Sequence, residues 1–215
     1  MRTLALEFSS TRRSVAAIAP GREPVEAVAA SGERNTQAFA LIADVLKRVH
    51  WNRRDIECIA VGLGPGSYTG VRVGISIAQG WQIARDINLL GLSSADAIAE
   101  QARCDGLRGL VTCLIDAQRQ EFYAAVYDLD DNAARAIEPL HIEPLVQATE
   151  RAARGEIIVS PDDHALITRR VFPTAAVIAR AASMRSDYLP CEKLEPIYLR
   201  EISFIKAPPP RFASP

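Results

Sequence analysis

The chain has 215 residues, of which 48% are hydrophobic and 24% charged, and its formal net charge is -1. This length and apolar content can bury a sizeable core, as one large domain or two small ones. The near-neutral charge, with arginines scattered along the chain, provides no basic stripe that would hold a nucleic-acid backbone unaided. No run approaches membrane-spanning length and Glu7 interrupts the apolar stretch that a signal peptide needs, so we expect a cytoplasmic protein without membrane contact.

The four cysteines and three histidines lack the spacing of a metal site or of a disulfide framework. The cysteines, at positions 58, 104, 113 and 191, never form C-x-x-C, and the histidines are far apart in the sequence. This pattern predicts free thiols in a reducing compartment and no bound metal.

The first half of the chain alternates between strand and helix patterns. The expected elements are strands at 4–8, 14–19 and 25–30, a helix to about residue 50, a strand at 58–61, a helix at 71–85, a strand at 88–92 and a helix to residue 103. Asn35 or Thr36 is the expected N-cap of the first helix, and Ser93 or Ser94 that of the last. This order of elements is that of a ribonuclease-H-like α/β lobe.

A second unit begins near residue 105. The expected elements are strands at 110–115, 121–127 and 133–140, a helix whose first turn holds Pro144, a strand at 156–160 and a helix at 175–185. Each unit opens with a strand, a polar turn and a returning strand. We therefore expect two similar lobes facing a cleft, at 1–104 and 105–206, the second smaller, and a proline-rich disordered tail at 207–215.

A glycine-rich turn at residues 62–74 joins a strand pattern to a helix pattern. Such a turn leaves backbone N–H groups at a helix start, where an anion, a substrate or another backbone can approach. It lacks the lysine of a P-loop and the spacing of a dinucleotide-binding fingerprint. Tight packing within an α/β core is at least as good an interpretation, with Ser67 and Thr69 as helix caps.

Four segments, in this order, resemble the TsaB (YeaZ) family: Leu-Glu-Phe-Ser-Ser at 6–10, the block at 64–74 with its continuation to 80, Ile-Asp-Ala-Gln-Arg at 115–119, and Glu-Pro-Ile-Tyr-Leu-Arg at 195–200. The resemblance implies the two-lobed α/β fold of actin, Hsp70 and sugar kinases (the ASKHA fold). It also implies a non-catalytic partner of TsaD in making N6-threonylcarbamoyladenosine in tRNAs that read codons starting with A.

The same resemblance implies where the cofactors and partners lie. The nucleotide and the catalytic metal belong to TsaD, and a further ATPase subunit, TsaE, joins the assembly. The chain itself is expected to bind no cofactor and to meet tRNA through the complex, and in this family the surface that contacts TsaD can also form a homodimer when TsaD is absent.

The chain departs from the family pattern at three places. Glu7-Phe8 stands where Asp-Thr is common, Asn35 stands where a histidine is frequent, and Gln118 replaces the arginine that usually follows Asp-Ala. The first two positions carry no catalytic role that could be transferred. The change at Gln118 weakens the idea of an anion site at the second turn.

A nucleotide-dependent kinase or ATPase is the alternative function, and a peptidase is less supported because no His-x-x-x-His is present. The candidate cofactor-binding residues are Glu7, Ser9, Ser10, Thr11 and Asp116. An ATPase of this fold group needs two glycine-bearing phosphate hairpins, and the second hairpin here has no glycine, so the nucleotide site looks dismantled. Glu7 and Asp116 could face each other as acid and base or hold Mg²⁺, or they could be remnants capped by nearby hydroxyl and backbone groups.

The helix expected at 71–85 carries no charge from 73 to 84, so we expect it to be covered on more than one side. The candidate partner interface comprises Phe39, Ile42, Leu46, Gly70, Arg72, Gly74, Ser76, Ala78 and Gln79. Gly70, Gly74 and Ala78 form a row of small residues that a partner backbone could approach, so Gly74→Arg should block association without unfolding the chain. The alternative is that the sheet and the preceding helix cover this helix within the chain.

Overall fold

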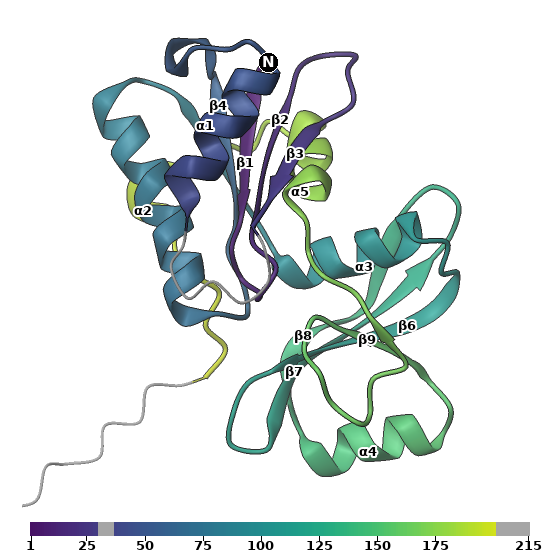
Figure 1. The fold of residues 1–215 in the computed structure, drawn as a ribbon. Coiled ribbons are helices and arrows are strands. Elements are labelled where there is room, and N and C mark those ends of the chain that lie inside the picture. Colours follow the sequence, from purple (N-terminus) through teal and green to yellow (C-terminus); the bar gives the residue numbers. More distant parts are fainter. Residues whose placement is uncertain (30–36, 201–215) are drawn as a thin grey trace, which may run out of the picture.

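Two five-stranded sheets form the framework of the computed structural model, which describes residues 1–29 and 37–200 (Figure 1). The sheet of the upper lobe in Figure 1 has the order β3-β2-β1-β4-β5. Its strands are β1 (Thr3–Glu7), β2 (Ser14–Ile18), β3 (Val25–Val28), β4 (Cys58–Gly62) and β5 (Asn88–Leu92). The first three strands are antiparallel, whereas β4 and β5 run parallel to β1. The strand predictions for this lobe are confirmed to within two residues.

Helices cover both faces of this sheet. The helices α1 (Ala38–Arg48) and α2 (Tyr68–Ala84) pack on one face, and α5 (Ala175–Ser183) packs on the other. The helix α2 begins three residues earlier than predicted because the Ser67 hydroxyl caps it, accepting a bond from the Gly70 N–H at 3.2 Å. The helix α1 has Gln37 as its N-cap, and the predicted caps Asn35 and Thr36 lie outside the described residues.

The second sheet has the order β10-β9-β6-β7-β8. Its strands are β6 (Gly109–Asp116), β7 (Glu121–Leu129), β8 (Ala134–Pro144), β9 (Ile157–Ser160) and β10 (Arg169–Arg170). It is covered by α3 (Ser94–Cys104) and, on the other face, by α4 (Leu145–Ala153). Pro144 ends β8 and precedes α4 instead of lying in its first turn, a correction that agrees with its extended backbone. Short 3-10 turns, η1 (Arg53–Asp55) and η2 (Cys191–Lys193), complete the described elements.

The packed lobes do not follow the predicted boundary at residue 104. The helix α3, which precedes that boundary, buries Ile98 and Ala102 against the second sheet. The helix α5, which follows it, buries Val177 and Ile178 against the first sheet. The chain therefore passes between the lobes more than once, which is possible because each helix buries its apolar face on whichever sheet leaves a face open. The predicted tail at 207–215 lies outside the described residues.

The row of small residues on α2 faces the protein's own sheet. A Cβ at Gly70 would lie 1.9 Å from the carbonyl oxygen of Phe8, and one at Gly74 would lie 3.1 Å from Cγ1 of Val61. Ala78 is likewise fully buried. The prediction that Gly70, Gly74 and Ala78 meet a partner is therefore wrong, because the close backbone approach is made by β1 and β4. Gly74→Arg would force a charge into this core and cannot report on association alone.

Candidate functional site

A cleft of about 480 Å³ opens between the two lobes. Its walls include Ser9, Ser10 and Thr11 of the β1–β2 turn, Gly64 and Gly66 of the glycine-rich turn, Asp116 and Gln118 of the β6–β7 turn, and Asp162 after β9. The structure thus brings together four of the five candidate cofactor residues from opposite lobes, as the prediction of two lobes facing a cleft requires. Glu7 is the exception.

Glu7 is buried beneath the cleft, in the core of the upper lobe. Its carboxylate accepts bonds from the Ser9 N–H at 2.7 Å and from the Ser94 hydroxyl at 2.9 Å. Burial raises the pKa of Glu7, and these hydrogen bonds only partly oppose the shift. A carboxyl that is fully covered and already bonded cannot serve as the cleft's acid, base or metal ligand. The contacts match the interpretation of a strand-end remnant capped by neighbouring groups.

The buried Glu7 also explains part of the glycine-rich turn. A Cβ at Gly62 would lie 1.9 Å from Oε2 of Glu7, so only glycine leaves room for this carboxyl. The Ser94 hydroxyl, which donates to Glu7, also accepts from the Gly64 N–H at 3.1 Å. At Gly66, a Cβ would meet the carbonyl oxygen of Ser9 at 2.2 Å. The tight-packing interpretation therefore accounts for these glycines, with no ligand required.

The polar groups of the β6–β7 turn bond to one another. The Asp116 carboxylate accepts from the backbone N–H and the side-chain Nε2 of Gln118, each at 2.7 Å. Gln118, Arg119 and Gln120 have φ values of 64°, 58° and 62°, three consecutive residues in the left-handed region without a glycine among them. Across residues 1–29 and 37–200, no three His, Cys, Asp or Glu side chains are grouped so that they could hold a metal ion.

A C-terminal strap, residues 189–200, crosses from the upper lobe to the lower lobe and lines the cleft with Pro196, Ile197 and Tyr198. The Leu189 and Ile197 N–H groups donate to the carbonyls of Leu89 and Leu63, each at 2.9 Å. The Arg200 guanidinium then donates to the Ala117 carbonyl at 3.0 Å, on the lower lobe. These bonds give the motif at 195–200 a structural role, which is to hold the strap across the cleft. That position could not be predicted from the sequence.

The strap also contacts one residue of the predicted partner interface, Gln79. Gln79 on α2 donates from Nε2 to the carbonyl of Cys191 at 2.8 Å, 112 positions away along the chain. Its Nε2 therefore holds the chain's own strap, and a contact of Gln79 with a partner stays a prediction.

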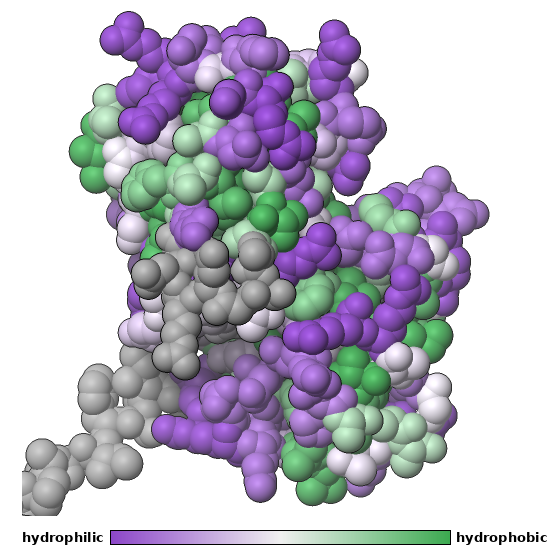
Figure 2. Space-filling view, in the orientation of Figure 1, coloured by the Kyte–Doolittle hydropathy of each residue, from purple (hydrophilic) through white to green (hydrophobic). Residues whose placement is uncertain are grey.

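A second hollow, the α1–α2 groove, has a volume of about 850 Å³ and lies on the outer side of the upper lobe. Figure 2 shows that this side of the upper lobe carries hydrophobic and near-neutral residues at its surface. The predicted residues Phe39, Ile42, Leu46, Arg72 and Ser76 all line it. Ile42 and Leu46 form its buried floor, whereas Phe39 stands at its edge with 68% of its surface exposed.

Sequence reasoning missed two thirds of the residues that line this groove. The further lining residues include Thr69, Val73, Ile77, Gly80 and Trp81 of α2, and Arg53 and Arg85 at its end. The available signal was the uncharged stretch of α2, because a helix without a charged face leaves an apolar stripe after the sheet has covered one side. The sheet covers one side of α2, as predicted. The second side that was expected to be covered lines the groove. The groove remains open within the described residues.

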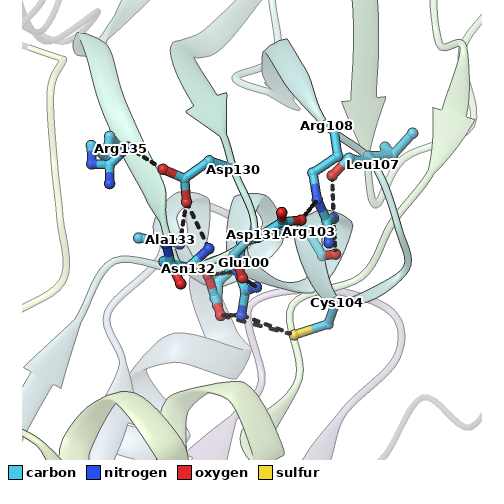
Figure 3. Close-up of polar contacts among 10 residues, drawn as sticks. All are labelled: Glu100, Arg103, Cys104, Leu107, Arg108, Asp130, Asp131, Asn132, Ala133 and Arg135. Carbon is cyan, nitrogen blue, oxygen red and sulfur yellow. Dashed lines mark hydrogen bonds and ion pairs between the residues drawn. The ribbon is translucent and has the colours of Figure 1, made fainter.

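A third hollow, of about 400 Å³, lies between α3, α5 and the β7–β8 turn. Beside it, Figure 3 shows two arginines that hold the turn: Arg103 donates to Glu100 at 2.6 Å and to the Asp131 carbonyl at 2.8 Å, and Arg108 donates to the Asp131 carboxylate at 2.9 Å. Beside them, Arg135 pairs with Asp130. This cluster fixes the β7–β8 turn on α3.

The chain has relatives among known proteins. A sequence model of the family described as TsaD, tRNA N6-adenosine threonylcarbamoyltransferase, matches residues 21–153, more than half of the chain. The tRNA threonylcarbamoyladenosine biosynthesis protein TsaB of Escherichia coli is 33% identical over 132 residues, covering 61% of this chain and 57% of the relative. TsaB of Bacillus subtilis is 29% identical over 105 residues, 49% and 45% of the two chains. The chain thus matches about half the length of these curated relatives, and they confirm the predicted resemblance.

The fold has a solved counterpart. A crystal structure described as an uncharacterized protein with similarity to peptidase YeaZ from Pseudomonas aeruginosa superposes with a TM-score of 0.76 and 24% sequence identity, over 93% of this chain and 99% of that chain. At this identity the likeness concerns the fold and carries no activity. It confirms the predicted two-lobed α/β architecture. None of the described helices is both long enough and apolar enough to cross a membrane.

Proposed function

The chain belongs to the TsaD family of tRNA N6-adenosine threonylcarbamoyltransferases, and we propose that within it the chain is a non-catalytic partner subunit of a TsaD protein. Its role is to stabilise and orient that TsaD during tRNA threonylcarbamoyladenosine biosynthesis, in the cytoplasm. The nucleotide and the catalytic metal then belong to TsaD, TsaE joins the larger assembly, and tRNA is met through the complex.

The α1–α2 groove carries this proposal. It is an apolar surface of the kind that an amphipathic helix of another protein can cover, and its edge holds Phe39, whose side chain is mostly exposed. Large exposed aromatic residues beside a hydrophobic hollow are typical of interaction sites, where they act as anchors in the partner's pockets.

The state of the cleft supports a role without chemistry. Its N-terminal hairpin presents Ser9, Ser10, Thr11 and Arg13, the Asp116 carboxylate in its second turn is bonded to Gln118, and Glu7 is buried below. A kinase or ATPase would need a cleft carboxylate positioned toward a metal-bound phosphate. We therefore place the activity of the complex on the partner and the contact on this chain.

Reconstitution with TsaD from the same source tests the proposal. We expect the two chains to co-purify, and threonylcarbamoyladenosine to form on tRNA only when both are present with TsaE, ATP and a supplied donor of the activated threonylcarbamoyl group. Phe39→Asp should weaken the complex at least about tenfold, because it would bury a charge in the apolar contact. A matched control is Val146→Asp on α4, since Val146 is 69% exposed and lies on the other lobe.

The outcomes separate the functions. An unchanged complex with Phe39→Asp would reject the groove as the contact. Full tRNA modification without this chain would reject the partner role. Tight binding of ATP and Mg²⁺ to the isolated chain, measured by calorimetry, would favour the kinase or ATPase alternative.

A further inference from the structure

Two arginines from different lobes meet at one aromatic ring. The Cζ of Arg12, in the β1–β2 turn of the upper lobe, lies 6.0 Å from the ring centroid of Phe172. The Cζ of Arg170, on β10 of the lower lobe, lies 4.9 Å from the same centroid. Phe172 belongs to the segment that leads from β10 to α5, and so from one lobe to the other (Figure 1). Arginines that are far apart in the sequence are thus gathered where the lobes join.

The backbone on the upper-lobe side of the ring is fixed in place. The Ala175 N–H, at the start of α5, donates to the Ser14 hydroxyl at the start of β2 at 2.8 Å. This bond ties the segment that carries Phe172 to the β1–β2 turn. Within that turn, the Ser10 hydroxyl accepts from the Arg12 N–H at 3.2 Å. The ring and the first arginine therefore lie together because of the fold and not because of their own contact alone.

The chain supplies no counter-charge to either arginine. Both side chains are exposed, and neither forms an ion pair within residues 1–29 and 37–200. Arg170 donates from Nε to the neutral carbonyl of Pro161 at 3.0 Å. The Asp162 carboxylate, next in the chain, accepts from the Asp116 N–H at 2.8 Å. Two like charges at one ring repel each other, and an anion placed between them would relieve this repulsion.

The chemistry of these side chains favours phosphate carried on a polymer. A guanidinium presents a planar fork of N–H donors that matches the oxygens of a phosphate. Arg12, Phe172 and Arg170, together called the junction patch, line none of the three hollows described above, so this open surface cannot enclose a small anion. A chain of successive phosphates can meet both arginines without being enclosed, and nucleic-acid backbones are held in this way.

We propose that the junction patch binds the phosphate backbone of an RNA, which thereby bridges the two lobes at the segment that connects them. The inference rests on the proposed function for the identity of the RNA, the tRNA of the complex, and adds a direct contact on this chain. Because the net charge of the chain is only -1, the two phosphate contacts add to a site that the partner must complete.

Binding of tRNA to the reconstituted complex tests the inference. We would measure the Kd of the complex with TsaD for unmodified tRNA by fluorescence anisotropy, between about 50 and about 200 mM NaCl. Arg12→Gln/Arg170→Gln should weaken tRNA binding about tenfold at low salt. It should also lower the slope of log Kd against log salt by about 2, one for each lost phosphate contact. The Kd of this chain for TsaD without tRNA, measured by calorimetry, should not change.

Two further variants separate the junction patch from net charge. Arg12→Lys/Arg170→Lys keeps both charges and should retain the parent's salt dependence. Arg22→Gln/Arg108→Gln removes the same charge from two exposed arginines elsewhere, in the β2–β3 turn and before β6, and should bind tRNA as the parent does. Thermal melting of each variant checks that it is folded.

The possible results separate this inference from the proposed function. Parent-like tRNA binding by the glutamine variant, equal losses in the glutamine and lysine variants, or an equal loss with Arg22→Gln/Arg108→Gln would overturn the RNA contact, while an intact TsaD complex upholds the partner role. A glutamine variant that loses TsaD in the absence of tRNA would assign the junction patch to an acidic protein surface and overturn the RNA contact. Absence of any TsaD complex with the parent chain would overturn the proposed function and this inference with it.

Discussion

Two arginine-bearing surfaces of this chain differ in how their charges are compensated. In the cluster on α3 and the β7–β8 turn, Arg103 and Arg108 bind carboxylates at 2.6 and 2.9 Å (Figure 3). Around the α1–α2 groove, Arg72 and Arg85 are ordered by rings and carbonyls. The first surface is complete by itself, whereas the second presents oriented cations beside an apolar floor. The same residue type therefore closes one surface and leaves the other ready for a partner.

The largest expected effect concerns how α2 is seated, because the groove exists only while this helix lies on the sheet. Gly70→Ala should destabilise the fold by at least about 3 kcal/mol, since the new Cβ would meet the Phe8 carbonyl oxygen at 1.9 Å. Gly80→Ala, on the same helix with no atom within 4 Å of its Cβ, should stabilise it by about 0.5–1 kcal/mol. Urea denaturation of both variants measures the difference, and equal shifts would mean that α2 is not seated as described.

An intermediate effect is expected at Glu7. Unlike the arginines of the two surfaces, this ionisable group is buried, and its partners are Ser9 and Ser94 with no cation among them. Because burial raises its pKa, the folded chain holds this proton more tightly than the unfolded chain. The resulting stability is full below the unfolded pKa, about 4.5, and is lost as the pH rises through the folded pKa. Glu7→Gln has no such proton to release, so it should gain stability relative to the parent between pH 4.5 and 7.5.

Urea midpoints at the two pH values check this prediction, with Glu7→Ala as the contrasting variant. The alanine would leave a cavity and unpaired groups at Ser9 and Ser94, and should be less stable than the parent at both pH values. If the stability of Glu7→Gln relative to the parent instead falls as the pH rises, the carboxylate is charged in the folded chain and its charged form is favoured there.

The smallest effects on stability should separate the two arginine surfaces directly. Arg108→Ala removes an exposed ion pair and should cost about 1 kcal/mol or less, without changing association with TsaD. Arg53→Ala should leave stability within about 0.5 kcal/mol of the parent, because its side chain closes no ion pair among the described residues, but should weaken association. Urea denaturation and TsaD-binding measurements on both variants check this prediction. Equal effects of the two variants on TsaD binding would contradict the difference between the two arginine surfaces.

The sequence by itself determined the local elements and the family. Alternating apolar residues and the flanking turns located β1 and β5, and the motif at 64–74 carried the resemblance that the relatives confirm. Such features depend on neighbours within a few positions, where hydrophobic period and capping act. The two-lobed architecture followed from the order of these elements.

Only the tertiary structure decided which faces are occupied. A row such as Gly70 and Gly74 shows that something approaches closely, but helical periodicity does not say whether a sheet of the same chain or a partner does so. The partner of Glu7 is Ser94, 87 positions away in the sequence, and that of Gln79 is Cys191, 112 positions away, so neither contact could be seen from local sequence. The open groove and its uncompensated arginines are what remains after the sheet, the strap and the crossing helices have covered the other faces, and that depends on packing across the whole chain.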